Sequence, residues 1–201
     1  MLEVLKKIVT NVLTALYQPF NYAVVLAVLV MFMYIFIKER GWKNLIKLWI
    51  QTFKNNVHFR CVFLSAFYTI MILFRTLFNR NMWANPVSNV IGTWGLYNDK
   101  GELTTEVIEN LILFIPFTIL LLMCYREKII GQTVKVGKTL WRSVKIVFLF
   151  SLSIEFLQLF LRLGTFQLSD LFYNTLGGFV GGLIYWIGYK LHNKYTKGTE
   201  E

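Results

Sequence analysis

Acidic and amide side chains recur at helical spacing in the last third of the chain. Glu155, Gln158 and Arg162 stand at positions i, i+3 and i+7, on one face of a helix. Asp170 and Asn174 are one helical turn apart. The surrounding sequence is strongly apolar, and an ionisable side chain in hydrocarbon costs about 2.5–3.5 kcal/mol. Such residues face partners or water, so they predict a site for a polar ligand or for internal ion pairs.

Residues of the same kinds occur in two earlier apolar runs. Arg75 interrupts the run 59–78, and Glu109 and Asn110 lie near the start of the run 107–125. Two interpretations of the charges stay open. Arg75 could neutralise Glu155 or Asp170 and hold helices together, or these groups could bind a polar headgroup. The two are compatible, because a paired site can also bind a headgroup.

The sequence lacks the motifs of several common classes of enzyme and cofactor site. The sequence contains no G-x-S-x-G element, no P-loop and no dinucleotide fingerprint. His58 and His192 fall outside the polar positions above, so we expect no metal and no cofactor, and we lean against an enzyme. Cys61 and Cys124 lie near span ends that we assign to the cytoplasm, where thiols stay reduced. We therefore expect packing cysteines rather than a disulfide.

The elements that position these residues are membrane helices. Hydrophobic residues make up 56% of the chain and charged residues 16%, against about 25% charged in soluble domains. A bilayer-crossing helix needs about 20 mostly apolar residues. We predict spans at residues 20–37, 59–78, 107–125, 144–161 and 171–191. The expected fold is an all-α integral membrane protein, a single domain over residues 1–201 with a bundle of five transmembrane helices.

Charge sets the predicted orientation. Lys and Arg number 21 against 11 Asp and Glu, a net charge of +10, and most of the basic residues lie in segments 38–60, 126–145 and 190–197. The positive-inside rule places these segments in the cytoplasm of a bacterial plasma membrane, with the N-terminus outside. The membrane topology then accounts for the basic charge, so no nucleic-acid partner is expected. The polar residues of four spans fall in the outer leaflet, which predicts a polar pocket there.

Two amphipathic segments flank the first span, at residues 1–18 and 41–58. In the second, Leu45, Trp49 and Phe53 recur at helical spacing opposite Lys47 and Lys54. Tryptophan and lysine suit a helix that lies in the headgroup layer and contacts anionic lipid. A surface anchor is the expected role, and a lipid sensor is the alternative.

The last predicted span contains glycines at regular four-residue spacing. Gly177 and Gly181 form one small-xxx-small pair, and Gly178 and Gly182 form a second that overlaps it. Such pairs let another helix approach closely. We expect these glycines to serve packing rather than ligand contact, and to bring Asn174 against the fourth span.

These motifs, taken together, resemble the VanZ-like proteins. The matching stretches are Ile154-Glu155-Phe156-Leu157-Gln158, Leu163-Gly164-Thr165, Ser169-Asp170-Leu171, Asn174-Thr175-Leu176-Gly177-Gly178 and, upstream, Glu109 to Phe117 with Phe114-Ile115-Pro116-Phe117. The resemblance covers about residues 59–189. It carries the family's site residues over onto Arg75, Asn110, Glu155, Gln158, Asp170 and Asn174. This chain departs from the family pattern at Gln167, where many members have an acid, and at Thr118, where a glycine is common.

The resemblance implies a phenotype, reduced susceptibility to teicoplanin and related lipoglycopeptides. The first hypothesis is that the pocket binds a membrane lipid headgroup, a lipid-linked cell-wall precursor or the antibiotic, with Arg75 meeting an anionic group. The second is a membrane enzyme that modifies a lipid-linked cell-envelope substrate, with Glu155 or Asp170 as general base. The third is a small transporter or scramblase. The oligomeric state stays open.

Overall fold

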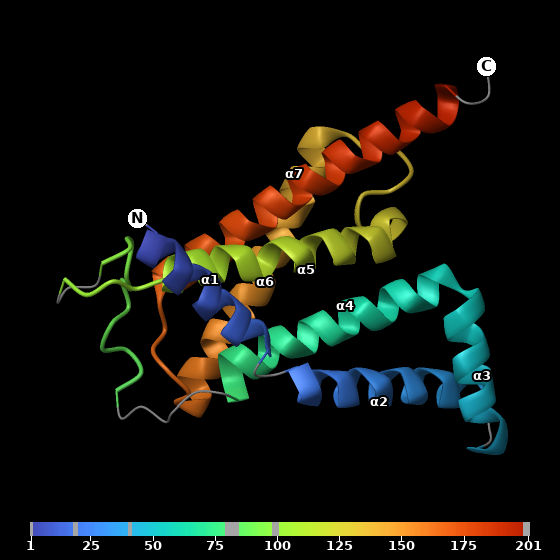
Figure 1. The fold of residues 1–201 in the computed structure, drawn as a ribbon, viewed down its shortest axis with the longest axis horizontal. Coiled ribbons are helices and arrows are strands. Elements are labelled where there is room, and N and C mark those ends of the chain that lie inside the picture. Colours follow the sequence, from blue (N-terminus) through green and yellow to red (C-terminus); the bar gives the residue numbers. More distant parts are fainter. Residues whose placement is uncertain (1, 18–19, 40–41, 79–84, 98–100, 199–201) are drawn as a thin grey trace.

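The structure, a computed structural model, describes residues 2–17, 20–39, 42–78, 85–97 and 101–198. Within these residues the regular secondary structure is helical, apart from an isolated β-bridge between Tyr97 and Leu103. The elements in chain order are α1 (Leu2–Tyr17), α2 (Phe20–Lys38), α3 (Trp42–Asn55), α4 (Val57–Leu73), the π-helical turn η1 (Phe74–Phe78), α5 (Glu106–Ile129), α6 (Val136–Leu161) and α7 (Leu168–Gly198). Figure 1 shows α5 lying between α4 and α7.

In the described part of the chain, three helices are long and apolar enough to cross a membrane: Val57–Leu77, Glu106–Ile129 and Val136–Leu161. They correspond to the second, third and fourth predicted spans. The fourth helix begins at Val136, eight residues before the predicted boundary at 144. Its added turns are held by packing, since Ser143 meets Gly182 of α7. The apolar part of α2, Ala23–Lys38, forms a shorter helix.

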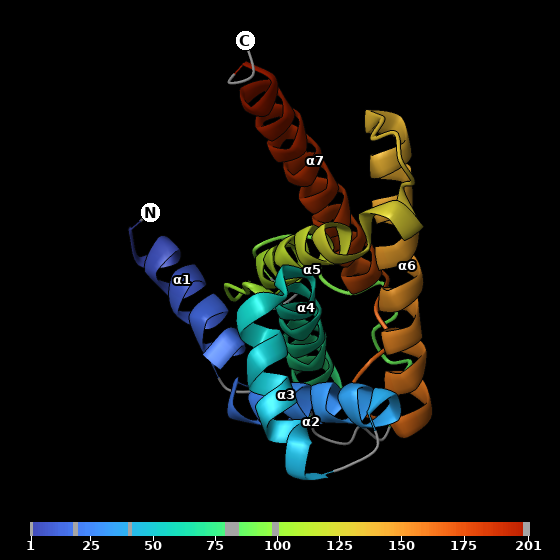
Figure 2. The same ribbon diagram turned by 90° about the vertical axis from the view of Figure 1, so that its right-hand side faces the viewer.

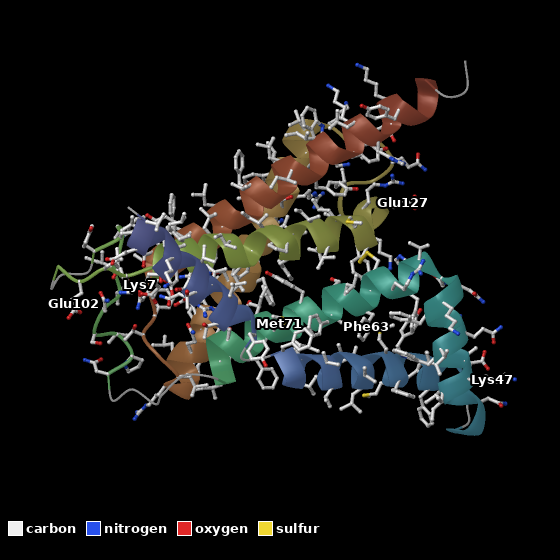
Figure 3. All side chains as sticks on the ribbon, in the orientation of Figure 1. Lys7, Lys47, Phe63, Met71, Glu102 and Glu127 are labelled. Atoms are coloured by element: carbon white, nitrogen blue, oxygen red, sulfur yellow. A yellow bond between two sulfur atoms is a disulfide. The ribbon has the colours of Figure 1, made fainter. Side chains whose placement is uncertain are left out.

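Two hydrophobic cores hold the bundle together. One joins α2, α3 and α4 around Met31, Leu45 and Phe59, and Phe63 lies between α4 and α2 in Figure 3. The other joins η1, α5 and α6 around Leu77, Phe114 and Val147. α7 packs along both α5 and α6, and α4 connects the two groups through α2 and α5 (Figure 2).

α3 differs from the predicted interfacial helix in length and in what its apolar face touches. It ends at Asn55 rather than near residue 58, because the Asn56 side chain accepts a 3.0 Å hydrogen bond from the Phe59 backbone N–H and caps α4. Trp49 and Phe53 stack on each other and pack against α4. The apolar face therefore packs on α2 and α4. Ile46 and Ile50 remain exposed beside Lys47 and Lys54.

The cysteine expectation was wrong. Cys61 of α4 and Cys124 of α5 form a disulfide, with Cα atoms 5.5 Å apart. α4 and α5 run side by side, so residues 63 positions apart in sequence come together at one end of the bundle. Two distant cysteines in separate spans carry no signal for this pairing, because it depends on which spans are neighbours.

Candidate outer-end polar cluster

Arg75 pairs with Glu109, whereas the sequence had suggested Glu155 or Asp170 as its partner in one of two open interpretations. Arg75 lies in η1, where the last turn of the α4 helix widens into a π-helix. Such turns are rare and often occur at functional sites. Glu109 lies in the first turn of α5 and also accepts a hydrogen bond from the Thr105 hydroxyl. Thr105 in turn accepts from Asn11 of α1 at 2.7 Å, so the chain of contacts joins three helical elements.

Removing one partner of the Arg75–Glu109 pair is expected to destabilise the fold. The side chains are 24% and 12% exposed, so a lone charge left there has little access to water. We expect Arg75→Ala or Glu109→Ala to lower the free energy of unfolding by about 2 kcal/mol, below the range for fully buried pairs. The double variant should lose much less than the sum of the two single losses. Denaturant unfolding in detergent micelles measures all three.

A matched control exists at the other end of α5. Arg126 and Glu127 lie 3.2 Å apart but are 35% and 75% exposed. Glu127→Ala is expected to cost less than about 1 kcal/mol. Strictly additive losses for Arg75→Ala and Glu109→Ala would show that the two side chains do not interact.

The second group of contacts joins α5, α6 and α7. The Asn110 side-chain amide donates to Asp170 Oδ1 at 2.8 Å, and both side chains are buried. Glu155 Oε2 accepts from the Gln167 backbone N–H at 2.9 Å, which holds the segment between α6 and α7 against α6. The predicted approach of α7 to α6 is also present, since Asn174 Nδ2 lies 2.9 Å from Ser151 Oγ.

Gln158 links this group to the first. Its Nε2 donates to the backbone carbonyl of Thr76 in η1 at 2.7 Å. Thr76 is the neighbour of Arg75, and Glu109 is the neighbour of Asn110. The six predicted positions therefore lie in two connected groups, contributed by η1, α5, α6 and α7. We call Arg75, Glu109, Asn110, Glu155, Gln158, Asp170 and Asn174 the outer polar cluster, after the leaflet in which the sequence predicts them.

The cluster is buried beneath a loop. Within it, Asn110, Glu155, Gln158, Asp170 and Asn174 are each at most 7% exposed. Residues 85–97 lie over the start of α7, where Leu168 N–H donates to Val90 O at 2.8 Å and Tyr173 O–H to Trp94 O at 2.8 Å. Gly92 has a φ of +74° and lies so close to Ser169 that a Cβ would come within 1.9 Å of its Oγ.

Sequence reasoning named Glu109 as a polar residue inside a span but gave it no role. It missed Asn11, Thr105 and Ser151, which are the hydrogen-bond partners of cluster residues or of Glu109. Small hydroxyl residues are common in apolar helices, so nothing in their type or spacing sets these positions apart. The loop between η1 and α5 packs on α7 within residues 85–97, while residues 79–84 and 98–100 lie outside the described residues.

The arrangement suits binding better than covalent chemistry. Three carboxylates, three carboxamides and a paired guanidinium offer hydrogen bonds and charge. A nucleophile beside a general base is not formed by these residues.

The structure also has a hollow of about 510 Å³ at the opposite end of the bundle. It is lined by His58, Met123, Cys124, Tyr125, Arg126, Glu127, Lys128 and Tyr185. None of the predicted site residues lines it. It is an alternative location for a ligand, and any test of the outer polar cluster must distinguish the two.

Comparison with known proteins supports the resemblance in the motifs. The model of the VanZ/LLP1 family matches residues 20–189. The chain is also similar to Protein VanZ of Enterococcus faecium, with 27% identity over 139 residues that cover 65% of this chain and 76% of that protein. No solved structure matches the chain.

Proposed function

The chain belongs to the VanZ/LLP1 family, and from this premise we propose that it lowers the susceptibility of a bacterium to teicoplanin and related lipoglycopeptides. The proposed mode of action is binding. The outer polar cluster engages a lipid headgroup, a lipid-linked cell-wall precursor or the antibiotic, and so reduces what the antibiotic can reach.

The observation that carries this proposal is the convergence of buried and half-buried polar groups from four separate elements. Four elements, η1, α5, α6 and α7, contribute Arg75, Asn110, Glu155 and Asp170 in that order. If these residues served only to pack helices, apolar side chains would do so at a lower cost in free energy. Polar and ionisable residues inside apolar helices are a functional site by default. Their hydrogen bonds hold the helix ends together and keep the groups ready for a ligand.

For the membrane arrangement we propose five spans, made by α2, α4 with η1, α5, α6 and α7. The surfaces of α2 and α7 support this, because large apolar side chains such as Leu29, Met33, Ile184 and Ile187 are exposed along them. Soluble monomers rarely expose apolar surface on this scale. Lipid contact would cover it.

We further propose that the outer polar cluster faces the cell exterior and that the basic end faces the cytoplasm. The charges support this orientation through the positive-inside rule. The Cys61–Cys124 disulfide argues against it, because that bond lies at the basic end and cytosolic thiols are kept reduced. Orientation therefore needs a direct measurement.

Labelling of single cysteines measures it. Glu102 and Glu127 lie at opposite ends of the molecule in Figure 3, and both are exposed. In a background with Cys61→Ser and Cys124→Ser, we expect Glu102→Cys to react with a membrane-impermeant maleimide on intact cells. Glu127→Cys should react only after the membrane is opened. The reverse pattern would place the cluster in the cytoplasmic leaflet.

The proposed function is tested by expressing the protein in a susceptible Gram-positive host. Teicoplanin susceptibility should fall, while susceptibility to a glycopeptide without a lipid tail changes less. No change for teicoplanin at confirmed membrane levels would refute the proposal. Conversion of a lipid-linked precursor by the purified protein would replace binding with the enzyme alternative, and lipid flip in liposomes would replace it with the scramblase alternative.

A further inference from the structure

Two buried amide oxygens of the outer polar cluster, Gln158 Oε1 and Asn174 Oδ1, have no hydrogen-bond partner among the residues that the structure describes. Their residues are 1% and 5% exposed, so water does not reach them from the surface. A buried acceptor without a partner costs about 1–3 kcal/mol. Most buried polar side-chain atoms in native proteins are bonded, so each exception calls for an explanation. These two atoms mark where a donor from outside the chain fits.

The orientation of the Gln158 amide is fixed by its neighbour. Its Nε2 donates to the Thr76 carbonyl oxygen at 2.7 Å, and a carbonyl oxygen can only accept. The reversed amide would set two acceptors against each other, so Gln158 must present its oxygen to the cluster. Asn174 contacts the Ser151 hydroxyl, which can donate or accept, so either end of its amide suits that contact. Gln158 Oε1 is thus the firmly assigned acceptor.

A ligand group that bonds to an unpartnered acceptor oxygen must itself be a hydrogen-bond donor. We infer that the outer polar cluster binds the hydroxyl or ammonium group of its ligand rather than the phosphate, an inference that rests on the proposed function of the cluster as a headgroup site. A phosphodiester carries only acceptor oxygens and cannot satisfy Gln158 Oε1, whereas hydroxyl and ammonium groups donate. The guanidinium of Arg75, the group best suited to phosphate, is already paired with Glu109. This reverses the expectation that Arg75 defines the ligand.

Two sources present this chemistry. Phosphatidylethanolamine and phosphatidylglycerol carry ammonium and hydroxyl groups, and the sugars and peptide amines of a lipoglycopeptide carry both. Phosphatidylcholine is the matched reference, because its quaternary ammonium has the same charge as ethanolamine but no N–H donor. The two sources are separated by titrating lipids and teicoplanin in different arms.

The test uses the purified full-length protein in detergent, titrated with short-chain forms of the three lipids and, separately, with teicoplanin. We expect ethanolamine and glycerol lipids to bind about fivefold more tightly than the choline lipid, as one hydrogen bond predicts. If teicoplanin itself is the ligand, its affinity should show the same dependence on Gln158. Equal affinity for the three lipids, with teicoplanin binding indifferent to Gln158, would overturn the inference.

Variants at Gln158 separate ligand contact from a structural role. Gln158→Met removes both the acceptor and the bond to Thr76, and should abolish the preference for ethanolamine over choline. Gln158→Glu loses the bond to Thr76 but keeps acceptor oxygens, so it should retain the preference. Thr118→Val is the control, because Thr118 is equally buried and bonds only within its own helix, to Phe114 O. Equal loss of the ethanolamine preference in both Gln158 variants would show that Gln158 supports the structure and does not contact the ligand.

The outcome also distinguishes this inference from the proposed function. Lipid or teicoplanin binding that is lost in Glu155→Ala but shows no donor preference would refute the inference and leave the cluster as the binding site. Binding that no cluster variant changes would refute both.

Discussion

Gly177→Ala and Gly181→Ala are each expected to lower the free energy of unfolding by about 3 kcal/mol, at the upper end of the usual range for overpacking. A Cβ on Gly177 would lie 2.3 Å from Leu111 O, and one on Gly181 would lie 2.6 Å from Ile115 O. Both obstacles are backbone oxygens of α5, which cannot rotate away. α7 must therefore move off α5, which separates Asp170 from Asn110 as well. Thermal unfolding in detergent measures the loss.

The same helix supplies the control. A Cβ on Gly188 would meet nothing within 4 Å. Gly188→Ala is expected to leave stability unchanged or to raise it slightly, since alanine is the better helix former by about 0.5–1 kcal/mol. Gly178 and Gly182 face short, buried side chains of α6, and an added Cβ would lie 2.7 Å from Val147 Cβ and 2.8 Å from Ser143 Cβ, so their alanine variants should also destabilise the fold. Equal melting temperatures for Gly177→Ala and Gly188→Ala would show that α7 does not pack against α5 in this way.

Glu155→Ala and Asp170→Ala are expected to abolish teicoplanin protection at unchanged membrane levels. Glu155 holds the backbone of Gln167, and Asp170 accepts from Asn110, so each removal takes a charge from the cluster and frees a neighbouring donor. Asp170→Asn is the finer probe, because it keeps the size of the side chain and removes its charge. The readout is the minimum inhibitory concentration, with membrane levels checked by immunoblot.

Glu127→Ala is the control for these variants. It removes a carboxylate that is exposed at the opposite end of the bundle, and it should leave protection intact. Full protection in Glu155→Ala and Asp170→Ala at wild-type levels would exclude the outer polar cluster as the functional site.

Residue types identified the cluster but not its pairing. Charged and amide residues are rare in apolar runs, so Arg75, Asn110, Glu155 and Asp170 could be named from sequence. Which carboxylate meets Arg75 depends on the register of α4 against α5 and on the π-turn, which turns Arg75 toward Glu109. The spacing of residue types in the sequence predicts neither this register nor the π-turn. The unpartnered oxygen of Gln158 is likewise visible only when its neighbours are placed.

The fold, too, was only partly predictable from the sequence. Helices of membrane length were predictable from the long apolar runs of α4, α5 and α6. The hydrophobic face of α3 was predictable, but its contact with α2 and α4 was not, because an amphipathic face suits protein and lipid equally. The packing of residues 85–97 on α7 rests on backbone hydrogen bonds, such as Leu168 N–H to Val90 O at 2.8 Å, which do not depend on side-chain type.

The most direct test of the central claim is an experimental structure of the protein in lipid nanodiscs with teicoplanin present. The predicted result is density for a lipid headgroup or for part of the antibiotic against Glu155 and Asn174, with a hydroxyl or ammonium group at Gln158. Ligand density confined to the hollow near His58 and Arg126, with the outer polar cluster closed, would contradict it.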